Sequence, residues 1–187
     1  MAASYFQKLY RGTGRRPLTS TRLSLFLIME QNIVKLSSEI NNNVVTFKQV
    51  YKNKIPKAAR TKITNSDKIY EYLKNVYDTD ELELRECFYV IYLNRSNEIL
   101  GHYLLSIGSV SGCFVSIASV IRDAALCNAS GVILSHNHPS GNTQPSDADK
   151  KITKNVKEAL KLIEVILLDH IIYAEDTYYS FANEGEL

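Results

Sequence analysis

Cysteine is scarce in this sequence, and no apolar run is long enough to cross a membrane. The 187 residues include only three cysteines, at positions 87, 113 and 127. They are too few and too scattered for a disulfide scaffold or a cysteine-rich zinc cage, so we interpret them as small buried side chains in a reducing compartment. A membrane-spanning helix needs about 20 apolar residues, and the run at 23–28 is far shorter. We therefore expect a cytoplasmic, globular protein with no membrane association.

A large surplus of charge is also missing, because the formal net charge is only +2. Residues 1–28 hold five basic and no acidic residues, whereas the chain from Met29 onward holds 17 basic and 20 acidic residues. Non-specific binding to nucleic acid depends on lysine and arginine neutralising phosphates. The body of the chain is therefore poorly suited to it. One helix face is rich in lysine, which we interpret as solvated: Lys150, Lys151, Lys154, Lys157 and Lys161.

The composition divides the chain into three parts. The basic leader at 1–28 is a flexible tail, a targeting segment, or an untranslated stretch upstream of a start at Met29. Residues 29–65 are polar and read as an N-terminal extension and linker, with a short strand at 44–47. Residues 66–187 form the folded domain. A chain of this size buries enough apolar surface to fold without disulfides or structural metals.

Hydrophobic periodicity predicts an α/β domain in residues 66–187. A helix begins at Ser66, where apolar residues recur at helical spacing. Aromatic and β-branched runs predict strands, two of which form a hairpin through the turn at 94–97. The predicted order is a helix from 66, strands 87–93 and 98–107, a helix at 117–129, a strand at 131–135, a helix at 147–163, and strands 165–173 and 178–181. This order predicts a mixed β-sheet flanked by helices.

The segment that follows the strand at 131–135 contains a candidate metal site. His136 and His138 are two residues apart at the end of a strand, so their side chains point to the same side. Asp149 lies in the first turn of the next helix, within reach of the same point. Two nitrogens and one oxygen leave a fourth tetrahedral position open, as in catalytic zinc sites. Ser146 is also a natural N-cap for that helix, and a capping hydroxyl can face the reactants as well.

These motifs resemble a known family. The pattern His136-x-His138, seven residues, Ser146-x-x-Asp149 matches the JAMM motif of the JAB/MPN metalloprotease superfamily without a gap. The flanking blocks resemble the RadC branch of that superfamily, and together they span about residues 60–187: 129–141, 168–172 and 179–185. The resemblance implies a JAB/MPN, cytidine deaminase-like fold in a short form that has no room for the helix-hairpin-helix region of full-length RadC proteins.

The resemblance also implies roles for individual residues. In the family, the two histidines and the aspartate hold Zn2+, which carries over to His136, His138 and Asp149. The serine, here Ser146, helps to stabilise the oxyanion that forms when water attacks a peptide or isopeptide carbonyl. A glutamate on an earlier strand acts as the general base. Our alignment places that glutamate at Leu104, which cannot accept a proton.

The missing glutamate leaves catalysis in question. Loss of a positioned base removes about 10²–10⁴ in rate. Glu98 is about 20 Å from position 104 along a strand, whereas His102 is about 6–7 Å away and is the best substitute. We interpret His170, beside Asp169, as a structural core residue. The sequence identifies no peptide or protein substrate, and it leaves a homodimer open.

Three functions remain from the sequence alone. The first is a zinc metallohydrolase with weakened activity, and the second is an inactive JAB-fold binding module linked to DNA repair or mobile elements. The third is a direct DNA-repair or nuclease role, which the acidic body argues against. A zinc deaminase is excluded because the chain lacks His-x-Glu and Pro-Cys-x-x-Cys.

Overall fold

The computed structural model describes residues 35–41, 44–50, 60–108 and 114–187. The leader at 1–28 and Cys113 lie outside the described residues. Two strands precede the main domain, β1 (Lys35–Asn41) and β2 (Val44–Val50). They form an antiparallel hairpin in which Lys35 is opposite Val50 and Asn41 is opposite Val44. The sequence analysis expected only a short strand at 44–47, because the partner strand is too polar to stand out.

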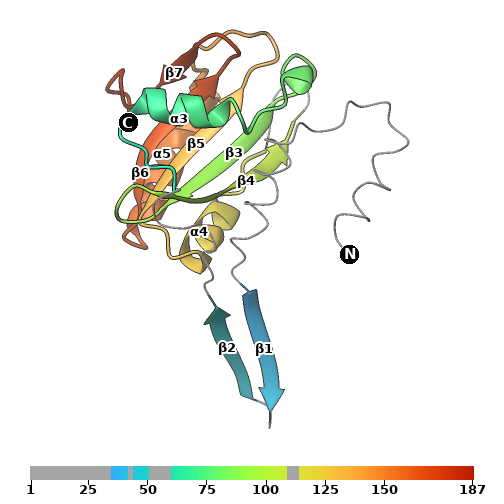
Figure 1. Ribbon diagram of the computed structural model, residues 1–187, viewed down its shortest axis with the longest axis vertical. Helices are drawn as coiled ribbons and strands as arrows, with labels where there is room; N and C mark the ends of the chain where they lie inside the picture. The colour runs from blue at the N-terminus through green and yellow to red at the C-terminus, as the bar shows by residue number, and fades with distance from the viewer. Residues whose placement is uncertain (1–34, 42–43, 51–59, 109–113) are drawn as a thin grey trace, which may run out of the picture.

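The main domain is built around a five-stranded mixed sheet (Figure 1). Its elements in chain order are α3 (Ser66–Leu73), the short helix η2 (Thr79–Glu81), β3 (Cys87–Leu93), β4 (Ile99–Ile107), α4 (Ile117–Leu126), β5 (Gly131–Asn137), α5 (Asp147–Lys161), β6 (Ile166–Tyr173) and β7 (Tyr178–Ser180). The strand order is β4-β3-β5-β6-β7. Only β5 and β6 are parallel, and α5 forms the crossover between them. The predicted α/β class with a mixed sheet is confirmed.

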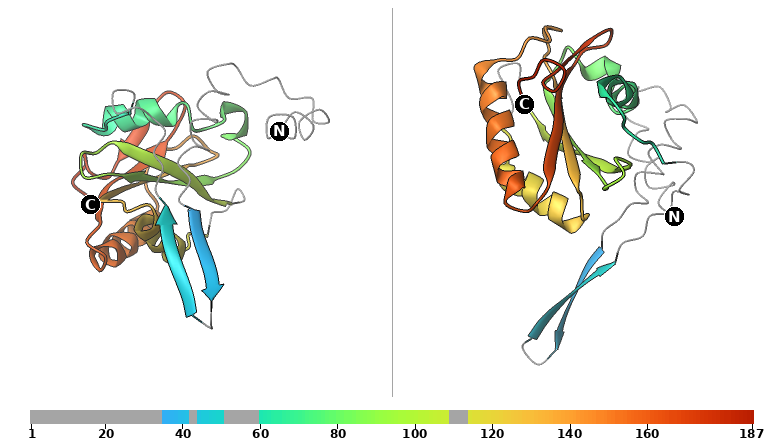
Figure 2. Two further views of the ribbon diagram at one scale, coloured as in Figure 1. Left: turned by 60° about the horizontal axis from the view of Figure 1, so that its bottom comes forward. Right: turned by 90° about the vertical axis from the view of Figure 1, so that its left-hand side faces the viewer.

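Helices cover both faces of this sheet (Figure 2). On one face, α4 and α5 pack against alternate strand residues such as Val90, Val132 and Leu134. On the other face, α3 packs against the intervening residues, including Ile91 and Ile133. This alternation follows from the two-residue period of a strand. Each residue of β3 and β5 therefore belongs to one of two cores. Only side chains on the face of the candidate site can reach it.

The predicted elements of the domain are all present, with small differences at their ends. Helix α4 ends at Leu126 and α5 at Lys161, each a few residues before the predicted end. Strand β5 continues two residues beyond the predicted end, to Asn137. His136 therefore lies within the strand, where every residue is buried. None of the helices in the described part of the chain is long and apolar enough to cross a membrane.

Candidate metal centre

His136 lies on β5, the central strand of the sheet. It lies opposite Phe88 of β3 and beside Ile172 of the parallel strand β6. Its side chain has no exposed surface, and its ring stacks on that of Phe88 with centroids 5.7 Å apart and planes 7° from parallel. Strand alternation points this side chain toward the α4–α5 face of the sheet. The orientation of His136 therefore follows from the strand pairing and from an aromatic contact.

His138 lies just beyond the end of β5, where the chain begins to turn back. Its Nδ1 is 2.6 Å from the backbone carbonyl oxygen of Asn142. The turn between them is closed by a bond from the amide of Gly141 to the carbonyl of His138, at 2.9 Å. Gly141 has a φ of 73°, a conformation that favours glycine. Because a carbonyl can only accept, Nδ1 of His138 donates, and Nε2 is left free in the neutral ring.

Asp149 is delivered by the first turn of α5. Ser146 caps this helix, since its hydroxyl accepts from the amide of Asp149 at 3.2 Å. The Asp149 carboxylate completes a capping box by accepting from the amide of Ser146 at 2.7 Å and from its hydroxyl at 2.6 Å. The sequence prediction that Ser146 is an N-cap is confirmed. The capping box also fixes the direction in which the carboxylate points.

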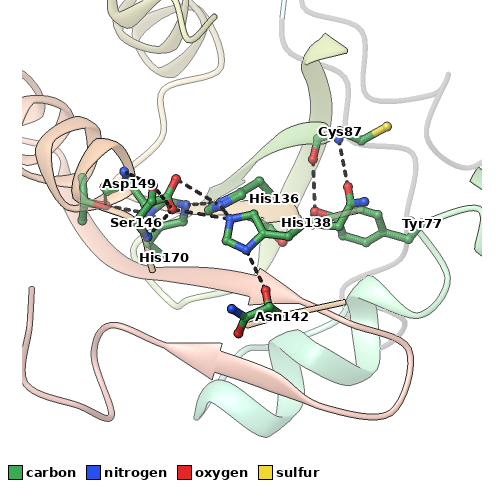
Figure 3. A network of polar contacts seen from close by, with 11 residues as sticks. Tyr77, Cys87, His136, His138, Asn142, Ser146, Asp149 and His170 are labelled. Carbon is green, nitrogen blue, oxygen red and sulfur yellow. Dashed lines mark hydrogen bonds and ion pairs between the residues drawn. The ribbon is translucent and has the colours of Figure 1, made fainter. Parts of the chain in front are cut away.

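The three side chains that the sequence singled out converge at one point (Figure 3). Nε2 of His136 is 3.0 Å from Nε2 of His138. The Asp149 carboxylate oxygens lie 3.2 Å from His136 Nε2 and 3.4 Å from His138 Nε2. Ligand atoms bonded to a tetrahedral zinc at about 2.0–2.1 Å are roughly 3.3 Å apart, so the separations and the donor types both fit zinc. This cluster could hold a metal ion.

The electrostatics of the cluster favour a cation. Burial raises the pKa of Asp149, but contacts with His136, His138 and Ser146 outweigh it and hold that pKa well below the ordinary value. The Asp149 carboxylate raises the pKa of His138, against a smaller opposing effect of burial. Asp149 is therefore ionised at neutral pH. A metal ion would compete with protons for His138, as is general for histidine ligands.

His170 contacts His136 through the ring nitrogen that does not face the cluster. It lies on β6 and is completely buried, with its ring stacked on Phe181 at a centroid distance of 4.9 Å. Burial and the neighbouring His136 lower its pKa well below the ordinary value. Its Nε2 is 2.9 Å from Nδ1 of His136. The interpretation of His170 as a core residue agrees with this burial, but sequence reasoning missed its contact with His136.

Sequence reasoning also missed Glu86, the residue immediately before β3. Phe88 lies opposite His136, so continuing the antiparallel register by two residues places Glu86 opposite His138 and on the same face. Its carboxyl is half-buried. Burial raises the pKa of Glu86, His136 and His138 lower it, and Asp149 raises it further. The carboxyl therefore interacts electrostatically with all three members of the cluster.

The expectation that Leu104 occupies the position of the family's glutamate is wrong. Leu104 lies on β4, opposite Tyr89 of β3. It packs into the core beneath α3, on the other face of the sheet. The suggested substitute, His102, faces the same way. Its Nδ1 is 2.7 Å from the hydroxyl of Tyr72 on α3, and burial lowers its pKa to about 4. Neither residue can reach the cluster, because the sheet lies between them.

A family model described as the RadC-like JAB domain matches residues 63–186 of this chain. The chain belongs to the RadC family. The match covers the whole sheet and its helices, and it agrees with the resemblance noted from the JAMM motif and its flanks.

Several RadC relatives are similar to the chain over this domain. A UPF0758 protein of Flavobacterium johnsoniae is 41% identical over 124 residues, covering 66% of this chain and 53% of that protein. The UPF0758 protein YfjY of Escherichia coli is 45% identical over 103 residues, covering 55% of this chain and 64% of YfjY. A UPF0758 protein of Aquifex aeolicus is 36% identical over 129 residues, covering 69% of this chain and 54% of that protein. The chain thus matches between about half and two thirds of each relative.

The capping box at Ser146 leads to a stability prediction. Replacing Ser146 with alanine should lower the free energy of unfolding by about 0.5–2 kcal/mol, because the Asp149 amide loses its acceptor. Ser146→Thr keeps a capping hydroxyl and should stay close to wild type. Chemical denaturation of the two metal-free variants measures the difference. Equal stability of the alanine variant and wild type would contradict the capping role.

Proposed function

We propose that this RadC-family domain is a zinc-dependent hydrolase of peptide or isopeptide bonds. The observation that supports it best is the convergence of His136, His138 and Asp149 on one point, with the Glu86 carboxyl on the same face beside them. Two imidazole nitrogens and one carboxylate form the ligand set of many catalytic zinc sites, which keep a fourth position open.

The residues of the chain divide the chemical work. A zinc ion held by the three ligands supplies Lewis acidity and lowers the pKa of water toward neutrality. Glu86 accepts the proton of the attacking water and passes it to the leaving amine. Its pKa, raised by burial, makes it a stronger base than an ordinary glutamate. The Ser146 hydroxyl, which donates to Asp149 in this structure, turns to donate to the developing oxyanion.

A cleft lies beside His138. Its volume is about 360 Å³, and His138 lies on its wall together with residues of the η2 region and of the β6–β7 connection. Part of the lining is apolar, including Leu82, Pro139 and Tyr173. Of the cluster residues only His138 lines this cleft, and we propose that the cleft takes a substrate segment next to the scissile bond. We accordingly favour a peptide or protein substrate.

The alternative of an inactive binding module depended on the absence of a base. Leu104, the residue expected in place of that base, is not part of this site. With Glu86 in place of the missing glutamate, the described residues include a member for each role that the resemblance implies. We therefore place hydrolysis ahead of a purely binding role.

Metal content tests the proposal directly. We expect elemental mass spectrometry of the full chain, purified with zinc supplied, to find about one zinc per chain. His138→Ala should abolish binding, because it removes one of three protein ligands. Zinc should also raise the melting temperature of wild type, by an amount that grows with free zinc concentration.

His102→Ala is the matched control for the metal experiment. It removes a histidine of the same domain that faces α3 and contacts Tyr72 instead of the cluster. We expect it to lose some stability but to keep a full complement of zinc. If wild type binds no zinc under these conditions, or if His138→Ala binds as much as wild type, the proposed metalloenzyme is refuted.

A further inference from the structure

A buried chain of hydrogen bonds links two of the three proposed ligands through groups that never touch the metal position. Nδ1 of His136 is 2.9 Å from Nε2 of His170, and Nδ1 of His170 is 2.6 Å from the hydroxyl of Thr153. That hydroxyl lies 2.5 Å from the backbone carbonyl oxygen of Asp149. His136, His170 and Thr153 are each at most 2% exposed, so water does not compete for these bonds.

The donor and acceptor of each bond follow from the backbone carbonyl of Asp149, at one end of the series. A backbone carbonyl can only accept, so the single proton of the Thr153 hydroxyl is donated to Asp149. The Thr153 oxygen must then accept from Nδ1 of His170. A neutral imidazole carries one proton, and Nε2 of His170 is therefore an acceptor. Nδ1 of His136 must supply the proton for that bond.

We infer that Thr153 and His170 are positioning residues that fix His136 in the tautomer whose Nε2 is free to bind a metal ion. The proton of His136 is committed to Nδ1, which leaves a lone pair on Nε2 directed at the cluster. This inference rests on the proposed metal-binding function. It adds two residues and a mechanism that the metal ligands alone do not reveal.

These hydrogen bonds also explain why the cluster needs a cation. Nδ1 of His138 is committed in the same way, to the carbonyl of Asn142. With both rings neutral, two unprotonated nitrogens face each other at 3.0 Å, beside an ionised carboxylate. Lone pairs at this distance repel unless a positive charge lies between them. The series of hydrogen bonds starts at the backbone of Asp149 and ends at His136. It therefore fixes the positions of both proposed ligands relative to α5.

Thr153→Val and Thr153→Ser separate positioning from packing. Valine keeps the shape of threonine but removes the acceptor for His170, so His170 gains by moving its proton to Nε2. It would then donate to His136 and force the His136 proton onto the metal-facing nitrogen. We expect the zinc affinity of Thr153→Val to fall about 10–100-fold. Serine keeps the hydroxyl and should bind within about threefold of wild type. If Thr153 acted only through packing, Thr153→Val would bind zinc at least as tightly as Thr153→Ser.

The measurements are zinc dissociation constants by competition with a chromophoric chelator, and absorption spectra of the cobalt-substituted proteins. Thr177→Val, on an exposed turn, serves as the control for the substitution itself. A folded Thr153→Val that binds zinc as tightly as wild type, with an unchanged cobalt spectrum, would overturn the inference. Failure of wild type to bind either metal would instead refute the proposed function.

Nitrogen NMR of metal-free wild type tests the inference without any substitution. Spectra of the ¹⁵N-labelled histidine rings, assigned with a His136→Gln variant, report which nitrogen bears the proton. We expect His136 to be protonated at Nδ1 and unprotonated at Nε2. A proton on Nε2 of His136 would overturn the inference, even if Thr153→Val failed to fold or no metal bound.

Discussion

Replacing Glu86 with glutamine is expected to lower the rate of amide hydrolysis by about 10²–10⁴-fold while zinc content stays at the wild-type level. Glutamine keeps the shape of the side chain but cannot accept a proton from water. The loss should appear in kcat, because the base acts in the chemical step. A suitable probe is a mixture of linear peptides and peptides joined through lysine side chains, with products identified by mass spectrometry.

The same substitution should raise the stability of the metal-free protein at neutral pH. Burial raises the pKa of Glu86 in the folded state above its unfolded value. Such a group stabilises the fold at low pH, and that contribution is lost as the pH rises through the folded pKa. Ionised Glu86 therefore costs stability at pH 7, and a neutral glutamine removes this cost. Stability gained together with activity lost is typical of a functional carboxylate.

The pH profile gives a further readout for Glu86. Only the ionised carboxylate can accept a proton, so activity should fall on the acid side through a pKa above that of ordinary glutamate. Glu71→Gln, on the exposed surface of α3, is the matched control and should change neither rate nor zinc content. If Glu86→Gln hydrolyses the probe peptides as fast as wild type, Glu86 is not the base.

The error at Leu104 shows where sequence reasoning fails in this domain. The convergence of His136, His138 and Asp149 could be predicted because all three lie within one short segment, where strand alternation and a helix cap fix their directions. Glu86, the base that we propose, directly precedes another strand, so its position depends on the register between β3 and β5. That register pairs Phe88 with His136, which no local pattern in the sequence reveals. Glu86 itself directly precedes a strongly predicted strand.

The elements of the domain were easier to predict than the contacts between them. Strand β3 is buried at every residue except Tyr89, and its aromatic and β-branched residues made it easy to predict. Helices α3 and α5 both have a polar cap and a clear apolar face. The link from Thr153 through His170 to His136 joins α5, β6 and β5. Sequence patterns describe one element at a time, so such links appear only once the elements have packed.

Removing the buried carboxylate of Asp169 should cost about 3–5 kcal/mol of folding free energy. Asp169 lies on β6, is 3% exposed, and points toward α3, on the face of the sheet opposite the candidate metal centre. One oxygen accepts from the hydroxyls of Ser66 at 2.9 Å and Ser180 at 2.7 Å. The other accepts from the amides of His170 at 2.7 Å and Ala182 at 3.0 Å. These four bonds tie the start of α3 to β6, β7 and the C-terminal segment.

Asp169→Ala removes the shared acceptor of all four bonds, whereas Asp169→Asn keeps one oxygen for the two amides. The asparagine nitrogen can donate to the two serine hydroxyls, which are able to accept. We therefore expect Asp169→Asn to lose far less stability than Asp169→Ala, whose melting temperature should fall by roughly 6–20 °C. Asp176→Ala, in the exposed β6–β7 turn, is the control. Equal melting temperatures for Asp169→Ala and this control would show that the bonds to Asp169 do not hold α3 and the C-terminal segment on the sheet.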